Sequence, residues 1–160
     1  MATMTTQSSQ TASPAKTDAK TDLAPQPIRP TLTDVNRPFW DACRDHRLTA
    51  QRCADCGELR YPPADICPQC LSQNSEWRQL SGRGEIFSFI VIHRGYHPYW
   101  AERVPYNVAL IELEEGLRMF SNVVGTPNDQ LRVGQKVVVS FEQRAADFVV
   151  PVFAIDSGRT

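Results

Sequence analysis

Two pairs of cysteines carry the clearest chemical signal in the sequence. Cys53 and Cys56 form one Cys-x-x-Cys pair and Cys67 and Cys70 form another, separated by residues 57–66. Each such turn directs two thiolates at one point, so two turns together complete the tetrahedral sulfur cage that suits Zn²⁺. Four thiolates leave no open coordination position, and the spacing therefore predicts a structural rather than a catalytic zinc.

Two other functions of paired cysteines fit part of this pattern. A rubredoxin-type redox iron takes the same four thiolates, although zinc is the usual metal of such ribbons. A thioredoxin-like dithiol needs one Cys-x-x-Cys beside a βαβ unit, whereas this chain has two pairs without one. The fifth cysteine, Cys43, lies on an expected apolar helix face, where we predict a small buried hydrophobe rather than a nucleophile.

A second candidate site is the segment 93–105, which is long for a connection between two neighbouring strands. Its aromatic, histidine and arginine side chains are typical of binding loops and interface centres. A groove of this composition would suit a long, thin ligand that bears phosphate. In the alternative interpretation, the three aromatic side chains only plug the mouth of a barrel. The candidate ligand-binding residues are Arg94, Tyr96, His97, Tyr99 and Trp100.

The sequence offers no set of catalytic groups. It contains no G-x-S-x-G, no P-loop and no G-x-G-x-x-G motif. His93 and His97 have the spacing of a helical metal pair, but Gly95 and Pro98 argue against a helix across them. Because no nucleophile, base and orienting group come together, the sequence argues against an autonomous enzyme.

The elements that must position these residues begin with a short helix. Asn36 offers an N-cap before a proline in the first turn, and the helix is expected to end near Arg47. Val35, Phe39, Ala42 and Cys43 fall on one face. Beyond it, residues 49–81 form the cysteine module, in which strands at 49–52 and 58–61 complete a zinc-ribbon pattern.

After residue 82 the composition becomes rich in β-forming runs and shows no long helix, which predicts a small closed barrel of five strands. The apolar run 86–92 predicts a strand that is covered on both faces. A tight turn at 114–116 joins the second and third strands. The five expected strands are Glu85–Ile92, Tyr106–Leu113, Leu117–Val124, Lys136–Glu142 and Phe148–Ile155.

Length and charge narrow the class of protein. A chain of 160 residues has room for one ordinary domain or two small ones. Its formal net charge of -1 gives no global positive field that would attract nucleic acid or an anionic membrane. No apolar stretch approaches the roughly 18 residues of a membrane span, and we expect a soluble cytoplasmic protein. Residues 1–34 are polar and are expected to form a disordered tail.

Several motifs together resemble a known family, the one that pairs a rubredoxin-like zinc ribbon with an acyl-CoA-associated OB-fold. The resemblance covers about residues 35–155, and no single motif would carry it alone. It rests on Arg37-Pro38-Phe39-Trp40, Gln51-Arg52-Cys53-Ala54-Asp55-Cys56-Gly57, Tyr61-Pro62-Pro63, Cys67-Pro68-Gln69-Cys70, Ser81-Gly82-Arg83-Gly84, Gly125 and Gly134.

The resemblance implies a mainly β protein with an N-terminal helix, a zinc ribbon and a five-stranded OB-fold barrel. The matching boundaries are a tail at 1–34, the helix at 35–48, the ribbon at 49–81 and the barrel at 82–160. Members of this family commonly act as small non-catalytic subunits of thiolase-like enzymes, including acyltransferases and steroid side-chain aldolases, and some accompany enoyl-CoA hydratases. By resemblance, Cys53, Cys56, Cys67 and Cys70 match the metal positions.

The leading hypothesis is therefore an accessory subunit that stabilises a larger CoA-thioester enzyme in a hetero-oligomer and helps to position the acyl-CoA. A free-standing acyl-CoA binding protein is the alternative. Single-stranded nucleic-acid binding is a third function that OB barrels and zinc ribbons serve, but residues 82–160 carry no basic excess for it.

Overall fold

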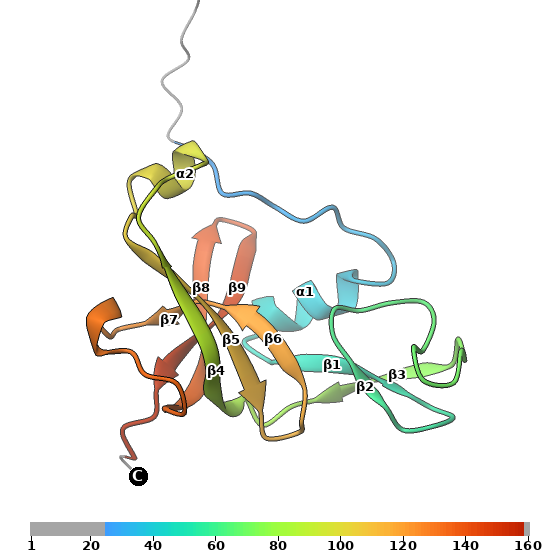
Figure 1. Ribbon diagram of the computed structural model, residues 1–160. Coiled ribbons are helices and arrows are strands. Elements are labelled where there is room, and N and C mark those ends of the chain that lie inside the picture. Colours follow the sequence, from blue (N-terminus) through green and yellow to red (C-terminus); the bar gives the residue numbers. More distant parts are fainter. Residues whose placement is uncertain (1–24, 159–160) are drawn as a thin grey trace, which may run out of the picture.

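The computed structural model describes residues 25–158 of the chain, and residues 1–24, most of the predicted tail, lie outside the described part. Figure 1 shows two β-rich parts side by side, a small ribbon and a larger barrel, with helix α1 (Arg37–Arg44) at their junction. No helix within residues 25–158 has the length and apolar character that crossing a bilayer requires. The mainly β architecture is confirmed.

The ribbon contains three antiparallel strands in the order β2-β1-β3. Two of them, β1 (Thr49–Cys53) and β2 (Leu59–Arg60), agree with the sequence pattern. The third, β3 (Ser75–Gln79), was not expected, because its side chains are polar and exposed except for a half-buried Trp77. Buried Gln51 joins the strands to the loop that follows them, since its Oε1 accepts from Arg60 Nε at 2.8 Å and from the Ala64 backbone N–H at 2.8 Å.

The barrel is a single sheet with the strand order β6-β5-β4-β8-β9-β7. Because its two ends, β6 and β7, are consecutive in the chain, the sheet curls round until they meet. A 3₁₀ turn at Asn128–Gln130 follows β7. The strands are β4 (Arg83–Ile92), β5 (Tyr106–Leu113), β6 (Arg118–Ser121), β7 (Val123–Val124), β8 (Lys136–Ala145) and β9 (Phe148–Ile155).

The prediction of five strands is corrected to six, since the run 117–124 divides at Asn122. Before this residue the chain pairs antiparallel with β5, and after it the chain pairs parallel with β9. The backbone of Asn122 accepts a hydrogen bond from the Phe153 N–H, and its side chain donates to the Asn107 carbonyl. Asn122 is therefore the point at which the chain changes partners and closes the barrel.

One continuous core unites the helix, the ribbon and the barrel. Phe39 and Cys43 of α1 pack with Ala50 of β1 and with Ile86, Phe153 and other side chains of the barrel. Asn36 occupies the N-cap position of α1 but its side chain does not cap the helix; it accepts from the Thr33 N–H and donates to the Thr31 carbonyl instead.

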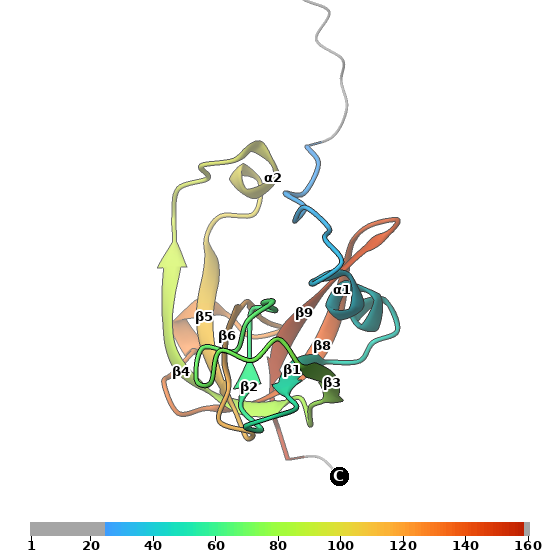
Figure 2. The ribbon, with the colours of Figure 1, turned by 90° about the vertical axis from the view of Figure 1, so that its right-hand side faces the viewer.

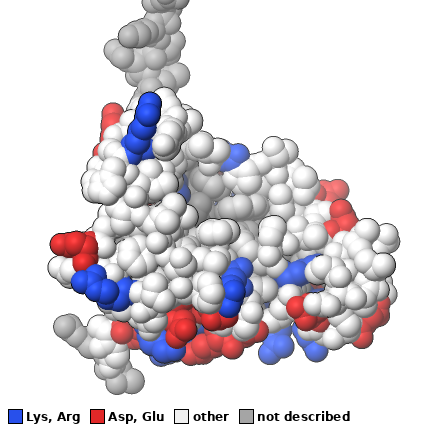
Figure 3. All heavy atoms as spheres, in the orientation of Figure 1, with Lys and Arg blue, Asp and Glu red and all other residues white. Residues whose placement is uncertain are grey.

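The prediction that β4 is covered on both faces is wrong. Ile86 is fully buried, but Phe87 and Ile90 are 40% and 59% exposed. On β6, which lies beyond β5 in the sheet, Phe120 is 70% exposed and lies opposite Leu110 of β5. The outer face of β4, β5 and β6 is therefore largely apolar, with Arg118 of β6 lying over the Phe87 ring at 3.6 Å from its centroid; Figure 3 shows mostly uncharged surface over these strands.

The connection between β4 and β5, residues 93–105, projects from the barrel and includes helix α2 (Pro98–Ala101) (Figures 1 and 2). We call this connection, with the strand ends that support it, the arm. Residues 25–35 run from beside α2 to the start of α1 in both views. Arg29 in this segment pairs with Asp147 of the β8–β9 turn, with its Nη1 at 2.7 and 2.9 Å from the two carboxylate oxygens.

Candidate functional site

The four predicted metal ligands form one cluster at the end of the ribbon. The sulfur atoms of Cys53, Cys56, Cys67 and Cys70 all lie within 4.8 Å of one another. The sulfurs of Cys53 and Cys70 are 3.5 Å apart, and those of Cys56 and Cys67 are 3.6 Å apart. In a tetrahedral zinc site with bonds of about 2.3 Å, neighbouring sulfurs stand about 3.8 Å apart. The donor set therefore fits Zn²⁺ in chemistry and in size.

The two cysteine turns have the same backbone geometry. The Gly57 N–H donates to the Cys53 carbonyl at 3.0 Å, and the Leu71 N–H donates to the Cys67 carbonyl at 2.9 Å. Both Gly57 and Leu71 have a positive φ, of 80° and 61°. Glycine adopts this conformation without strain, whereas leucine does so at a cost.

Backbone N–H groups lower the pKa of two of the four thiols. The pKa of Cys53 is lowered to about 6, chiefly because the Cys56 backbone N–H donates to its sulfur, which outweighs the opposing effect of burial. The pKa of Cys67 is lowered in the same way by the Cys70 backbone N–H. Because metals bind thiolates rather than thiols, this arrangement favours the ligating form.

Hydrogen bonds outside the cluster hold the two cysteine turns together. The carboxylate of Asp55, which lies in the first turn, accepts from the Ser72 hydroxyl and from Asn74 Nδ2, both beyond the second turn. The Ala54 N–H donates to the Asn74 carbonyl at 3.1 Å. Cys43 lies apart in the core, fully buried, and burial raises the pKa of its thiol to about 12.

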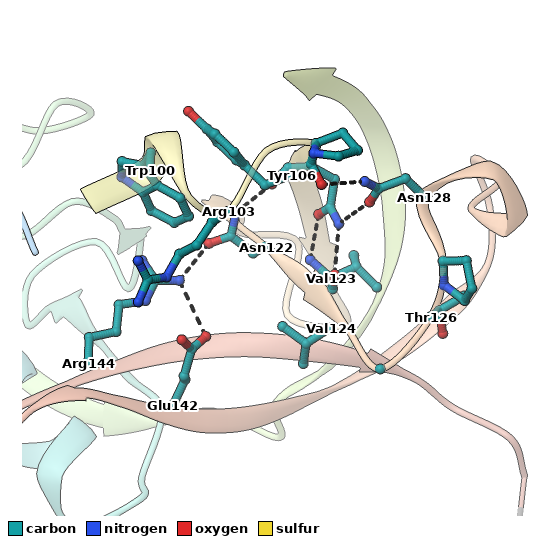
Figure 4. Close-up of a pocket in the computed structure, with 14 residues that line it drawn as sticks. Trp100, Arg103, Tyr106, Asn122, Val123, Val124, Thr126, Asn128, Glu142 and Arg144 are labelled. Atoms are coloured by element: carbon teal, nitrogen blue, oxygen red, sulfur yellow. Dashed lines mark hydrogen bonds and ion pairs between the residues drawn. The ribbon is translucent and has the colours of Figure 1, made fainter. Parts of the chain in front are cut away.

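An open pocket of about 360 Å³ lies at the base of the arm. Its lining comes from the end of the arm, from the segment that includes β7 and from the far end of β8 (Figure 4). The residues that line it include Trp100, Arg103, Tyr106, Asn107, Asn122, Val123, Val124, Thr126, Asn128, Glu142 and Arg144.

Aromatic rings hold the arginine side chains of this pocket. The ring of Trp100 stacks on Tyr106 with centroids 4.4 Å apart, and the Arg144 guanidinium lies 4.9 Å from the Trp100 ring centroid. Arg103 lies 3.8 Å above the Tyr99 ring and donates from Nη1 to the Tyr99 carbonyl at 2.5 Å.

Asparagine side chains tie the floor of the pocket to the barrel. Buried Asn107 donates to the Val123 carbonyl at 2.8 Å and accepts from the Val123 N–H at 2.7 Å. Its Nδ2 also donates to Asn128 Oδ1 at 2.9 Å. Asn122 Oδ1 accepts from Arg144 Nη2 at 2.7 Å. These amides are engaged with one another and with the chain, so their role is to hold the pocket in shape.

The structure separates the five ligand-binding candidates that the sequence grouped. Trp100 lines the pocket, and Tyr99 is buried behind it. His97 is the N-cap of α2, where its Nδ1 accepts from the Tyr99 N–H at 3.2 Å. Tyr96 is 79% exposed, and the exposed Arg94 lies 5.5 Å from its ring centroid. Of the five, Trp100 alone reaches the pocket.

Arg103 and Pro105 belong to the predicted segment 93–105, whereas the lining residues outside that segment were not placed in a site by the sequence. Arg144 lies far from the arm in the chain and comes beside Trp100 only because β8 folds back along the barrel. Asn107 and Asn122 did carry a signal, since each interrupts an apolar run in which a polar side chain must find hydrogen-bond partners.

Comparison with known proteins adds two matching family models. Residues 40–76 match the model described as "ChsH2, rubredoxin-like zinc ribbon domain". Residues 77–142 match the model described as "ChsH2, C-terminal OB-fold domain". The two models meet within β3, the last strand of the ribbon.

Curated relatives and a solved structure are also similar to this chain. The probable enoyl-CoA hydratase alpha subunit of Thermomonospora curvata is 39% identical over 88% of this chain, which spans 44% of that relative and so less than half of it. The benzoylsuccinyl-CoA thiolase subunit BbsA of Thauera aromatica is 32% identical over 62% of this chain and 69% of its own length. A solved structure of the Ltp2-ChsH2(DUF35) aldolase superposes with a TM-score of 0.73 and 37% identity, covering 79% of this chain and 98% of that chain.

Proposed function

The chain belongs to the ChsH2 family of zinc-ribbon and OB-fold proteins, and from this premise we propose that it is a non-catalytic accessory subunit of a CoA-thioester enzyme. It stabilises a larger thiolase-like subunit and helps to position the acyl-CoA. Its relatives are named as subunits of CoA-related enzymes, which supports this class of role. Zn²⁺ held by the four cysteines is structural and stabilises the ribbon.

The observation that best supports this proposal is the position of the arm beside the pocket. It brings aromatic and arginine side chains to the rim of an open pocket beside the barrel. The residues that line the pocket include no His, Cys, Ser or Lys, and their one carboxylate, Glu142, lies 3.5 Å from the Arg144 guanidinium, which supports a binding role. The reacting groups would come from the partner.

The apolar outer face of β4, β5 and β6 supports a subunit role. Exposed Phe87, Ile90 and Phe120 gather on one surface, and an apolar patch of this kind is typical of a protein-binding face. A thiolase-like partner is the first candidate. A hydratase partner is the second, favoured by the 39% identity to a hydratase alpha subunit.

The test begins with capture of the tagged full-length chain from its source cells and mass spectrometry of the proteins that co-purify. The identified partner is then expressed with and without this chain, and complex formation, kcat and KM for its CoA thioester are measured. We expect a stable complex and a lower activity of the partner alone. Absence of a complex together with unchanged activity would overturn the proposal.

Two other functions give different results in the same samples. A free-standing acyl-CoA binding protein would bind the thioester but would form no complex with a partner enzyme. A single-stranded nucleic-acid binding protein would show salt-sensitive binding to an oligonucleotide at micromolar protein, which a net charge of -1 disfavours.

A further inference from the structure

We propose that Arg103 and Arg144 form a binding site for a phosphate group of CoA at the rim of the pocket, an inference that rests on the proposed function. The two side chains come from distant segments, one just after α2 and one near the end of β8. Both line the same pocket, and Figure 4 shows them on the same side of it, beside Trp100.

Both guanidinium groups are held in place before a ligand arrives. Arg103 rests on the Tyr99 ring and uses one nitrogen, Nη1, for the Tyr99 carbonyl. Arg144 lies over the Trp100 ring and uses Nη2 for Asn122. A guanidinium carries five N–H donors in one plane, so stacking leaves the others free to bind an anion at the edge.

The charges of the pocket favour an anion. Among its lining residues, the two arginines face a single acid, Glu142. The closest approach of Glu142 to Arg144 is 3.5 Å, between Oε2 and Nη2, which is longer than an ordinary charge-assisted hydrogen bond. One positive charge of the lining therefore remains uncompensated. In addition, the Nε of Arg144 is buried and has no hydrogen-bond partner in the described structure.

The same contacts determine which part of CoA fits. One face of Trp100 stacks on Tyr106, and Arg144 also lies over the ring, so Trp100 is already engaged before an adenine could stack on it. Trp100 is thus a positioning residue for Arg144. Two convergent forks of N–H donors match the oxygens of a phosphate, and the volume of about 360 Å³ leaves room for the adjoining ribose or pantetheine.

Calorimetric titration of the full-length zinc-loaded chain tests this site with CoA, dephospho-CoA and pantetheine. We expect CoA to bind, pantetheine to bind not at all, and CoA binding to weaken as salt increases. Arg103→Gln and Arg144→Gln should each weaken CoA binding about tenfold or more, because each removes charge-assisted hydrogen bonds. Arg78→Gln is the matched control, since Arg78 is an exposed arginine of the ribbon, and it should change the affinity less than about twofold.

Dephospho-CoA tells the two phosphate sources apart: weaker binding places the 3′-phosphate at the site, and equal binding places the diphosphate there. Zinc content and melting temperature verify that each variant is folded. If Arg144→Gln unfolds, Arg103→Gln still tests the site, because Arg103 is exposed.

No CoA binding at millimolar ligand, equal binding of pantetheine, or unchanged affinity in both variants would overturn the site. If the partner complex still forms, these failures leave the proposed function standing. CoA binding by a chain that forms no complex with any partner enzyme would instead remove the accessory role.

Discussion

Removal of the metal should expose four thiols and leave a fifth one buried. The chain has five cysteines, of which four form the cluster and Cys43 lies in the core. In the zinc-loaded protein, coordination protects the four ligands, and burial keeps Cys43 protonated and inaccessible. We therefore expect no fast reaction with a thiol reagent. After chelation at neutral pH, the four ligands should react quickly, and Cys43 should react only in denaturant.

The size of the effect follows from how little else holds the cysteine turns. Residues 53–72 are mostly exposed, and apart from the two buried ligands Cys53 and Cys67 their only buried side chain is Arg60. Structural zinc contributes on the order of 10 kcal/mol to such a module. Without it, the conformational entropy of this segment has no comparable opposing contribution, so the turns should unfold while the barrel core remains.

Two variants at fully buried cysteines separate the metal from the packing. Cys53→Ser should lose stoichiometric zinc and leave three ligand thiols reactive without a chelator. Cys43→Ala should keep its zinc and lose about 1–2 kcal/mol of stability from the small cavity. Metal analysis, thiol counting and urea unfolding give the readouts. The reasoning is refuted if the purified protein holds iron, if Cys53→Ser keeps its zinc, or if chelation leaves the four thiols unreactive.

Three further predictions concern stability. Gly84→Ala should cost more than about 2 kcal/mol in urea unfolding, because the added Cβ would overlap the Glu112 carbonyl oxygen of β5; an unchanged midpoint would contradict this. Leu71→Gly should raise the stability of the zinc-loaded protein by about 1 kcal/mol by removing a left-handed leucine, and a lower melting temperature would show that its side chain contributes packing. Tyr61→Phe should flatten the alkaline loss of stability: burial raises the pKa of Tyr61 from 10.0 to about 12, so the folded state keeps a proton that the unfolded state releases, and stability falls as pH rises from 10 to 12. An equally steep pH dependence of unfolding in the variant would count against that role.

The ribbon was predictable because its constraint is local. Two Cys-x-x-Cys turns specify a cage through spacing alone, and the structure brings the four sulfurs together. Strand β3 escaped prediction since its pairing with β1 needs backbone hydrogen bonds and gives little burial, so the side chains of Ser75–Gln79 carry no alternation. Hydrophobic periodicity does not indicate a polar strand whose stability comes from backbone pairing with a neighbouring strand.

The exposed face of β4 escaped prediction for the opposite reason. A run of apolar residues indicates burial on both sides only when the chain itself supplies both covers. Here Ile86 turns into the core, whereas Ile90 is 59% exposed and Phe87 is covered only in part, by the Arg118 guanidinium, 3.6 Å from its ring centroid. In a subunit, exposed apolar side chains can become buried when a partner binds. The sequence pattern does not distinguish burial by a partner from burial within the chain's own fold.

The Asn107 side chain links the pocket to the barrel wall. Strands β5 and β7 share no backbone pairing; the Asn107 side chain supplies both a donor and an acceptor to Val123 in its place. The chain therefore leaves the barrel wall open at this point and fills the gap with amides. The pocket is the outer side of that gap, and the aromatic arm covers its upper rim. Arg144 of β8 reaches the pocket from far along the chain, so the site requires barrel closure before Arg144 can meet Trp100 and Arg103.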